Sequence, residues 1–386
     1  MMETTVWLAG GLVALLVGGE LTVRGGTGLS RILGVSPLFI GLTVVAFGSS
    51  SPELVVNLIG AFSDQTDLAF GGVVGSNLAN IGLVLALATI IASIRIQGEM
   101  IRKEIPLLLL VTTALLVLCL DPWLTGGAAV LDRSDALILL LLFILFMYVS
   151  ISDVLRERQV DPLARAAEHA AEGGTVALAP APGGSTATGA GSDASPDALA
   201  QNEPEATNAP ASSSVPGSAG APAAASVPVR ADKPFSPVPA IALLVVGLAL
   251  LVLGGDLTVT HATRLAEYFG APSVVVGLAV VAIGTSLPEL VTSIVAALRG
   301  EPDLAVGNVI GSNLFNTAFV LGITGLVTPV PVPTGGIFDL VVGAFFVALL
   351  IPFALTGPRR LVRLEGVALL AAYLLYLGLR FSGVGA

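Results

Sequence analysis

The sequence has very few of the residues on which disulfide-bonded proteins and many hydrolases depend. It contains one cysteine and two histidines among 386 residues. The single cysteine, Cys119, excludes an intrachain disulfide. His169 and His261 are far apart in the sequence, so they cannot form the H-E-x-x-H motif of a metalloprotease, and a serine hydrolase would lack its base. We therefore expect no enzyme and no cofactor.

Charged residues are also scarce. They make up 11% of the chain, against about 25% in a typical soluble domain. Hydrophobic residues make up 54%, and the mean hydropathy is +0.93. This composition excludes an ordinary soluble domain and predicts an all-α membrane protein. We predict ten transmembrane helices, five in each half: 5–23, 36–62, 68–93, 105–121, 135–153, 238–258, 271–298, 303–327, 337–356 and 364–381.

The two halves of the chain are copies of each other at a constant offset of 236 residues. Residues 40–62 match 276–298 at 12 of 23 positions, and residues 68–86 match 304–322 at 11 of 19. An odd number of helices per half inverts the second copy relative to the first. We therefore predict a first repeat over 1–153 and a second, inverted repeat over 238–386. Inverted repeats whose spans are interrupted by Gly and Pro are typical of transporters, and the interruptions mark the ion site.

Basic residues predict the orientation in the membrane. If the N-terminus lies outside, the inner connections carry most of the arginines and the outer connections carry mainly aspartates, as the positive-inside rule requires. The inner connections hold Arg24, Arg31, Arg95, Arg102, Lys103, Arg156, Arg158, Arg165, Arg299, Arg359, Arg360 and Arg363. We therefore predict a multi-pass protein of a prokaryotic plasma membrane with both termini outside.

Residues 154–237 differ from the rest of the chain. They are rich in Ala, Pro, Gly and Ser and have few large apolar side chains, so they cannot bury enough surface to fold. We predict a disordered cytoplasmic linker. The alternative, a regulatory calcium-sensing domain, would need strand alternation or a clustered acidic loop, and neither is present.

Two glutamates stand in the middle of predicted spans. Glu53 and Glu289 occupy the same position in the two repeats, and no basic residue lies in either span to pair with them. A carboxylate at bilayer depth costs about 2.5–3.5 kcal/mol on insertion scales, which favours a functional role. Both glutamates belong to a cation site in this interpretation.

Small oxygen-bearing residues precede each glutamate, and a proline breaks each helix. Pro52 and Pro288 have no N–H and crowd the preceding turn, so they should free the backbone carbonyls of Ala46, Phe47, Ala282 and Ile283 or near neighbours. Carboxylates, hydroxyls and carbonyls together suit a hard cation such as Ca²⁺, which takes about six to eight oxygen ligands. The hydroxyl candidates are Ser49, Ser50, Thr285 and Ser286.

A second motif, G-S-N-L-x-N, also occurs in both repeats. Its serine and second asparagine are four residues apart and share one helix face. Such residues can simply join helices by hydrogen bonds, but beside two buried glutamates they are candidate ligands. These candidates are Ser76, Asn80, Ser312 and Asn316. Asn77 and Asn313 lie on a different face, and we interpret them as structural.

The two signatures together resemble the sodium/calcium exchanger superfamily of cation antiporters. This resemblance implies that the four motif-bearing helices pack at the centre and that the residues above, with the Ala46 and Ala282 carbonyls, bind the transported ions. It implies Ca²⁺ extrusion against Na⁺ or H⁺ by alternating access. Some sodium-coupled members carry Asp at the position of Asn316, so both coupling ions stay open.

Three other expectations follow. A cation channel is the rival class, although broken inverted repeats fit a carrier better than a symmetric pore. The repeat pair Glu20 and Asp256 sits near span ends, and we expect Glu20 to pair with Arg24 rather than bind a transported ion. The expected partners are the lipid bilayer and the ions Ca²⁺ and Na⁺ or H⁺, with no nucleic acid, and we expect a monomer.

Overall fold

The computed structural model describes residues 2–62, 67–95, 100–120, 126, 129–159, 237–269, 282–355 and 360–382. The described parts of both halves pack together in one unit. Most of the predicted linker lies outside the described residues. Its first six residues belong to a helix that runs to Gln159, and its last, Pro237, begins the next helix.

The first half is almost entirely helical. Its helices are α1 (Met2–Leu33), α2 (Pro37–Ile40), α3 (Ala46–Ser49), α4 (Ser51–Phe62), α5 (Asp67–Ala79), α6 (Ala86–Ile91), α7 (Ile105–Leu118) and α9 (Arg133–Gln159). Three π-helical stretches interrupt them: η1 (Gly41–Val45), η2 (Asn80–Leu85) and η3 (Met100–Glu104). Ser36 caps α2 by accepting the Phe39 N–H at 3.2 Å, and Pro37 starts that helix, where a missing N–H costs nothing.

The second half repeats this pattern. Its elements are α11 (Pro237–Tyr268), α13 (Ala282–Thr285), α14 (Leu287–Leu298), α15 (Pro302–Leu314), η5 (Phe315–Val320), α16 (Leu321–Val327), α17 (Gly336–Leu355) and α18 (Arg363–Phe381). The first part of the predicted broken span 271–298 lies outside the described residues up to position 281. The rest forms α13 and α14.

Six helical segments of the described chain are long and apolar enough to cross a bilayer. They are Glu3–Leu33, Ala69–Ile91, Arg133–Ser152, Pro237–Tyr268, Pro302–Val327 and Gly336–Leu355. The pair Pro37–Ser49 and Ser51–Phe62, bent by 42°, makes a seventh if it is one span. A mostly helical membrane protein is therefore confirmed, while ten spans stay a prediction.

Apolar side chains face outward along these helices. On α9, for example, Leu141, Ile144 and Tyr148 are each more than 60% exposed. A water-soluble surface rarely carries such a continuous apolar face, but a lipid-facing helix requires one. The exposed apolar faces therefore agree with burial in a bilayer.

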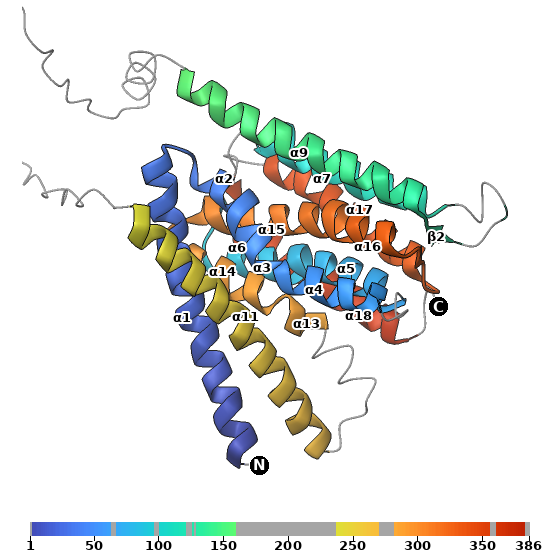
Figure 1. Ribbon diagram of the computed structural model, residues 1–386, viewed down its shortest axis with the longest axis horizontal. Helices are drawn as coiled ribbons and strands as arrows, with labels where there is room; N and C mark the ends of the chain where they lie inside the picture. The colour runs from blue at the N-terminus through green and yellow to red at the C-terminus, as the bar shows by residue number, and fades with distance from the viewer. Residues whose placement is uncertain are drawn as a thin grey trace, which may run out of the picture. The chain divides into compact units, whose positions relative to one another are not determined.

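The helices α1 and α11 lie side by side along a seam of glycines (Figure 1). A methyl group on Gly18 would lie 2.8 Å from the amide nitrogen of Leu251, and one on Gly254 would lie 2.7 Å from that of Leu15. Small residues allow membrane helices to approach this closely.

Both helices continue about ten residues beyond the predicted ends at 23 and 258, so those predicted ends are wrong. Gly25 lies beyond the predicted end and is a packing position within α1, because a methyl group on it would lie 2.5 Å from the Leu244 nitrogen.

We expect Gly18→Ala to lower the Tm of the protein in detergent or nanodiscs relative to Gly10→Ala. Both glycines lie within α1, so both changes gain similar helix propensity, but a methyl group at Gly10 meets nothing within 4 Å. Overpacking at Gly18 should cost about 1–3 kcal/mol because the contacting atoms are backbone. Equal Tm values for the two variants would show that the seam tolerates a methyl group.

Two short antiparallel sheets join the halves. β1 (Ile94–Arg95) pairs with β4 (Arg360–Leu361), and β2 (Val130–Leu131) pairs with β3 (Val330–Pro331). Each sheet takes one strand from each half, and β1 and β3 are related by the same 236-residue offset as the motifs. The two repeats are therefore interlocked.

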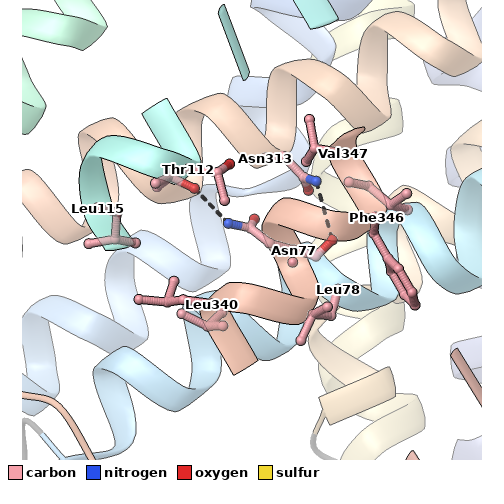
Figure 2. A pocket seen from close by; sticks show the side chains of 12 residues that line it. Asn77, Leu78, Thr112, Leu115, Asn313, Leu340, Phe346 and Val347 are labelled. Carbon is pink, nitrogen blue, oxygen red and sulfur yellow. Dashed lines mark hydrogen bonds between the residues drawn. The ribbon is translucent and has the colours of Figure 1, made fainter. Parts of the chain in front are cut away.

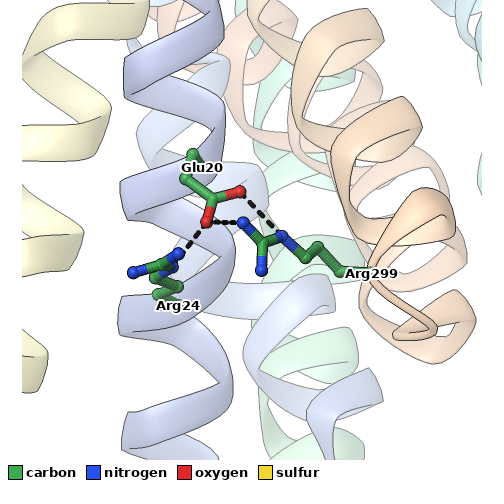
Figure 3. A network of polar contacts seen from close by, with 3 residues as sticks. All are labelled: Glu20, Arg24 and Arg299. Atoms are coloured by element: carbon green, nitrogen blue, oxygen red, sulfur yellow. Dashed lines mark hydrogen bonds and ion pairs between the residues drawn. The ribbon is translucent and has the colours of Figure 1, made fainter.

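An ion-pair network ties α1 to the turn between α14 and α15 (Figure 3). Glu20 accepts hydrogen bonds from Arg24 at 2.5 Å and from Arg299, whose Nε lies 2.8 Å from Glu20 Oε2. The predicted Glu20–Arg24 pair is thus confirmed. Nearby, Arg31 lies 3.9 Å from Glu301; burial raises the pKa of Glu301, and the Arg31 guanidinium opposes this shift.

We expect Arg299→Gln to lower stability by at most about 1 kcal/mol, and the loss should shrink as salt is added. The reason is that Arg299 and Glu20 are partly exposed, so water and ions screen their attraction. Arg264→Gln is the matched control, because Arg264 is exposed and takes part in no ion pair described for this chain. A loss above about 2 kcal/mol that salt does not reduce would contradict this account.

Candidate ion-binding site

The two broken helices bend at equivalent residues. Ser50 follows α3 and Ser286 follows α13, and both have φ −88° and ψ 6°. A proline follows each serine by two residues, Pro52 in the first repeat and Pro288 in the second. Proline has no N–H and cannot donate a helical hydrogen bond. The equal backbone angles show that the duplicated sequence folds into the same local break in both halves.

Each break places a glutamate in the first turn of the following helix. Glu53 in α4 is 4% exposed and Glu289 in α14 is fully buried. Both carboxylate oxygens of Glu53 and Oε2 of Glu289 have no hydrogen-bond partner among the described residues. The two carboxylates are also close enough to repel each other. Such groups need a cation or protons to balance their charge.

Predicted ligands from both repeats surround Glu289. The Ser50 hydroxyl donates to Glu289 Oε1 at 3.1 Å. The hydroxyl oxygens of Ser49 and Ser312 lie 3.5 Å apart, and both side chains are fully buried. The structure therefore brings Ser49, Ser50, Glu289 and Ser312 together across the repeats. Ser286 is also buried, with a hydroxyl that has no described partner, and Thr285 is half-buried.

The second motif ends in π-helices in both halves. Asn80 begins η2, and Asn316 is the second residue of η5. A π-helical turn widens a helix locally and is frequent at functional sites. The helix α14, which carries Glu289, packs against η2, and α4, which carries Glu53, packs against η5. Each glutamate-bearing helix thus contacts the asparagine-bearing stretch of the other repeat.

Hydrogen bonds orient both asparagines. Asn80 Nδ2 donates to Asn313 Oδ1 at 3.0 Å, and Asn316 Nδ2 donates to Ser76 Oγ at 3.2 Å. In both cases the amide oxygen is buried and has no described partner. An amide held by its nitrogen presents its oxygen, which is the atom that a hard cation binds.

The expected free carbonyl at Ala46 is a wrong prediction. The Ala46 oxygen accepts the Ser50 N–H at 3.0 Å, because the helix continues through Ser49 before it breaks. Phe47 O accepts the Ser51 hydroxyl at 2.7 Å. The Ser49 hydroxyl also lies 3.4 Å from the Ala46 oxygen. Ala282 is the first described residue of α13.

Asn308 lies within the candidate site, and neither motif predicted it. It is fully buried in α15, and its Oδ1 accepts the Ser49 hydroxyl at 3.1 Å. Its Nδ2 donates to Ser293 Oγ at 3.1 Å and to the Glu289 carbonyl at 3.4 Å. Asn308 therefore joins the helix break of one repeat to the glutamate-bearing helix of the other. The repeat comparison could not find it, because the equivalent residue is Gly72.

The candidate site contains two carboxylates together with hydroxyl and amide oxygens that can act as cation ligands. In the described parts of the chain, no group of three or more His, Cys, Asp or Glu residues could hold a resident metal ion. Two carboxylates with neutral hydroxyl and amide oxygens suit a hard cation.

Comparisons with known proteins agree with this geometry. The family model described as sodium/calcium exchanger protein matches residues 3–152 and 239–382. The chain is 32% identical to the putative antiporter CaxA of Alkalimonas amylolytica over 99% of this chain and all of that protein. It is 31% identical to the inner membrane protein YrbG of Escherichia coli over 85% of this chain and 81% of that protein.

The fold has also been seen in solved structures. A structure of the sodium-calcium exchanger NCX_Mj soaked with 10 mM Na⁺ and zero Ca²⁺ superposes with a TM-score of 0.69, over 98% of both chains, at 24% sequence identity. The family model covers both halves of the chain, including both glutamates and both G-S-N-L-x-N motifs. The chain therefore belongs to the sodium/calcium exchanger family of membrane cation antiporters.

Proposed function

We propose that the protein exchanges Ca²⁺ for Na⁺ across a prokaryotic plasma membrane by alternating access. The observation that carries this proposal is the pair of buried glutamates: both carboxylate oxygens of Glu53 and one of Glu289 lack described protein partners. Two ionised carboxylates balance one Ca²⁺ or two Na⁺, so the same site can hold either cargo without a large uncompensated charge. The sodium-calcium exchanger NCX_Mj has the same fold.

The proposed ligands come from four helical regions, two in each repeat. They are Glu53, Glu289, Ser49, Ser50, Thr285, Ser286, Ser76, Asn80, Ser312 and Asn316, with the carbonyls of Ala46 and Ala282. The helix packing and hydrogen bonds described above support this set.

The proposed architecture is ten spans in two inverted repeats. It is supported by the equal backbone angles at Ser50 and Ser286, and by the two sheets that each take one strand from each half. The basic residues in the connections and helix ends that are predicted to face inward support an orientation with both termini outside and the linker in the cytoplasm.

Proton coupling is the second candidate. Two protons neutralise the two glutamates as well as two Na⁺ ions do. The hydroxyl and amide oxygens can accept hydrogen bonds from the protonated glutamates or bind the Na⁺ ions. The difference lies in the driving gradient, because only an H⁺-coupled antiporter would run on a pH gradient without Na⁺.

Calcium uptake into proteoliposomes under separately imposed Na⁺ and pH gradients tests the proposal. We expect uptake that requires internal Na⁺, saturates with Ca²⁺ and stops when the Na⁺ gradient is removed. Uptake driven by a pH gradient alone would favour H⁺ coupling. Uptake that does not saturate and needs no counter-ion would contradict an antiporter and favour a channel.

A further inference from the structure

The two G-S-N-L-x-N motifs hydrogen bond differently in the two halves. In the first, Asn80 Nδ2 donates to Asn313 Oδ1. The 236-residue offset predicts the mirrored bond from Asn316 Nδ2 to Asn77 Oδ1. Instead, Asn316 Nδ2 donates to Ser76 Oγ, and Asn77 Oδ1 is buried without a described partner.

Thr317 accounts for this difference. Its hydroxyl accepts a hydrogen bond from Asn77 Nδ2 at 2.7 Å, whereas Asn316 Nδ2 donates to Ser76. The equivalent residue in the first repeat is Ile81, which has no polar atom to offer Asn313. Asn313 Nδ2 donates instead to the Asn77 backbone carbonyl at 3.2 Å. One hydroxyl, present in one repeat only, therefore breaks the symmetry of the network.

Asn77 and Asn313 line a small pocket (Figure 2). It has a volume of about 20 Å³ and is lined by Asn77, Asn313, Thr317, Thr112 and apolar side chains of the neighbouring helices. That volume is enough for about one water molecule. The Thr112 hydroxyl is committed to the Leu108 carbonyl at 2.8 Å.

We propose that Thr317 and Asn77 form a positioning pair that keeps Asn316 bonded to Ser76 and so sets the affinity of the ion site for its cations. The inference rests on the proposed function, because it takes Asn316 as a ligand. Without the Thr317 hydroxyl, the Asn77 amide loses its acceptor and can rotate to offer Oδ1 to Asn316 Nδ2. The Asn316 amide would then rotate and lose its bond to Ser76. The direction in which it presents Oδ1 to the bound ion would change.

The test compares Thr317→Val with Thr317→Ser in purified full-length protein. Valine keeps the shape of threonine without the hydroxyl, whereas serine keeps the hydroxyl. The first measurement is the rise in Tm on titration with CaCl2 or NaCl, which needs no transport. The second is the Ca²⁺ concentration for half-maximal exchange in proteoliposomes. We expect Thr317→Val to raise half-saturating concentrations by about tenfold, the low end for outer-shell partners of metal ligands, and Thr317→Ser to stay near wild type.

A double variant tests whether Thr317 acts through Asn77. In an Asn77→Ala background, Thr317→Val should cause little further change, because the amide that it releases is gone. The pH dependence of exchange should be the same in all these variants, because neither amides nor hydroxyls of this kind titrate near neutral pH.

Equal shifts in the Val and Ser variants would overturn the proposal, as would a Thr317→Val protein with a lower Tm but unchanged half-saturating concentrations. Additive effects of Thr317→Val and Asn77→Ala would overturn it too. If wild-type protein exchanges Ca²⁺ and only the variants fail to behave as expected, the proposed function stands. A wild-type protein that responds to neither cation would overturn the proposed function and this inference with it.

Discussion

Replacing either buried glutamate by glutamine should abolish Ca²⁺ exchange while the protein still folds and inserts. Glu53→Gln and Glu289→Gln keep the shape of the side chain and remove its charge. With one carboxylate left, a bound Ca²⁺ would have one uncompensated charge in a low-dielectric site. The measurement is Na⁺-dependent Ca²⁺ uptake into proteoliposomes, normalised to the amount of folded protein. We expect uptake at the level of empty liposomes in both variants.

Glu267→Gln is the matched control, because Glu267 lies on the exposed end of α11. It should transport like wild type. Stability adds a second readout: because each carboxylate is costly in a bilayer, we expect the glutamine variants to have Tm values equal to or above that of wild type in the absence of cations. Uptake near the wild-type rate in either variant would refute the assignment of the site.

The sequence alone points to these two residues for a physical reason. An acid in the middle of an apolar run is costly, so its presence calls for a functional explanation, and the duplication shows it twice. The structure then adds what composition cannot show, namely that Ser49, Ser50 and Ser312 gather beside Glu289. That arrangement depends on tertiary packing between residues more than 200 positions apart.

Asn308 and Thr317 show where the repeat comparison fails. It finds only what the two copies share, but the residue equivalent to Asn308 is Gly72, and the residue equivalent to Thr317 is Ile81. Asn308 and Thr317 are therefore polar residues that one copy has and the other lacks. A search for polar residues in one repeat that replace apolar or small residues in the other would have found both.

The predicted end of the first span, at residue 23, is wrong for a different reason. Glycine favours a loop when the chain is considered alone, since it is a poor helix former. Gly25 lies within α1 because it faces the backbone of α11, where a side chain would not fit. The π-helical stretches η2 and η5 were likewise not predicted, because a single inserted residue hardly changes the hydrophobic pattern.

Exchange should be electroneutral if the two glutamates alone set the charge of the site. The neutral amide of Asn316 is buried beside Ser76 and adds no third charge. One Ca²⁺ then exchanges for two Na⁺ or two H⁺, and three Na⁺ would leave one positive charge uncompensated. Imposing a membrane potential on proteoliposomes should therefore change net Ca²⁺ flux little. The measurement is Ca²⁺ uptake at several potentials set by K⁺ and valinomycin.

The Asn316→Asp variant tests the same argument by adding a third acid. Its carboxyl can bind a proton or an extra Na⁺, so we expect transport to become steeply pH-dependent and to respond to membrane potential when that carboxyl is ionised. Asn316→Ala is the control, because it removes the same amide without adding a charge, and it should lower affinity without a new pH dependence. The contrary result is a wild-type current that reverses at the membrane potential expected for exchange of three Na⁺ for one Ca²⁺. This result would mean that hydroxyl and amide dipoles hold a third Na⁺ without a third carboxylate. In that case the affinity of the site for Na⁺ would depend on the orientation of the Asn80 and Asn316 oxygens rather than on the number of acids.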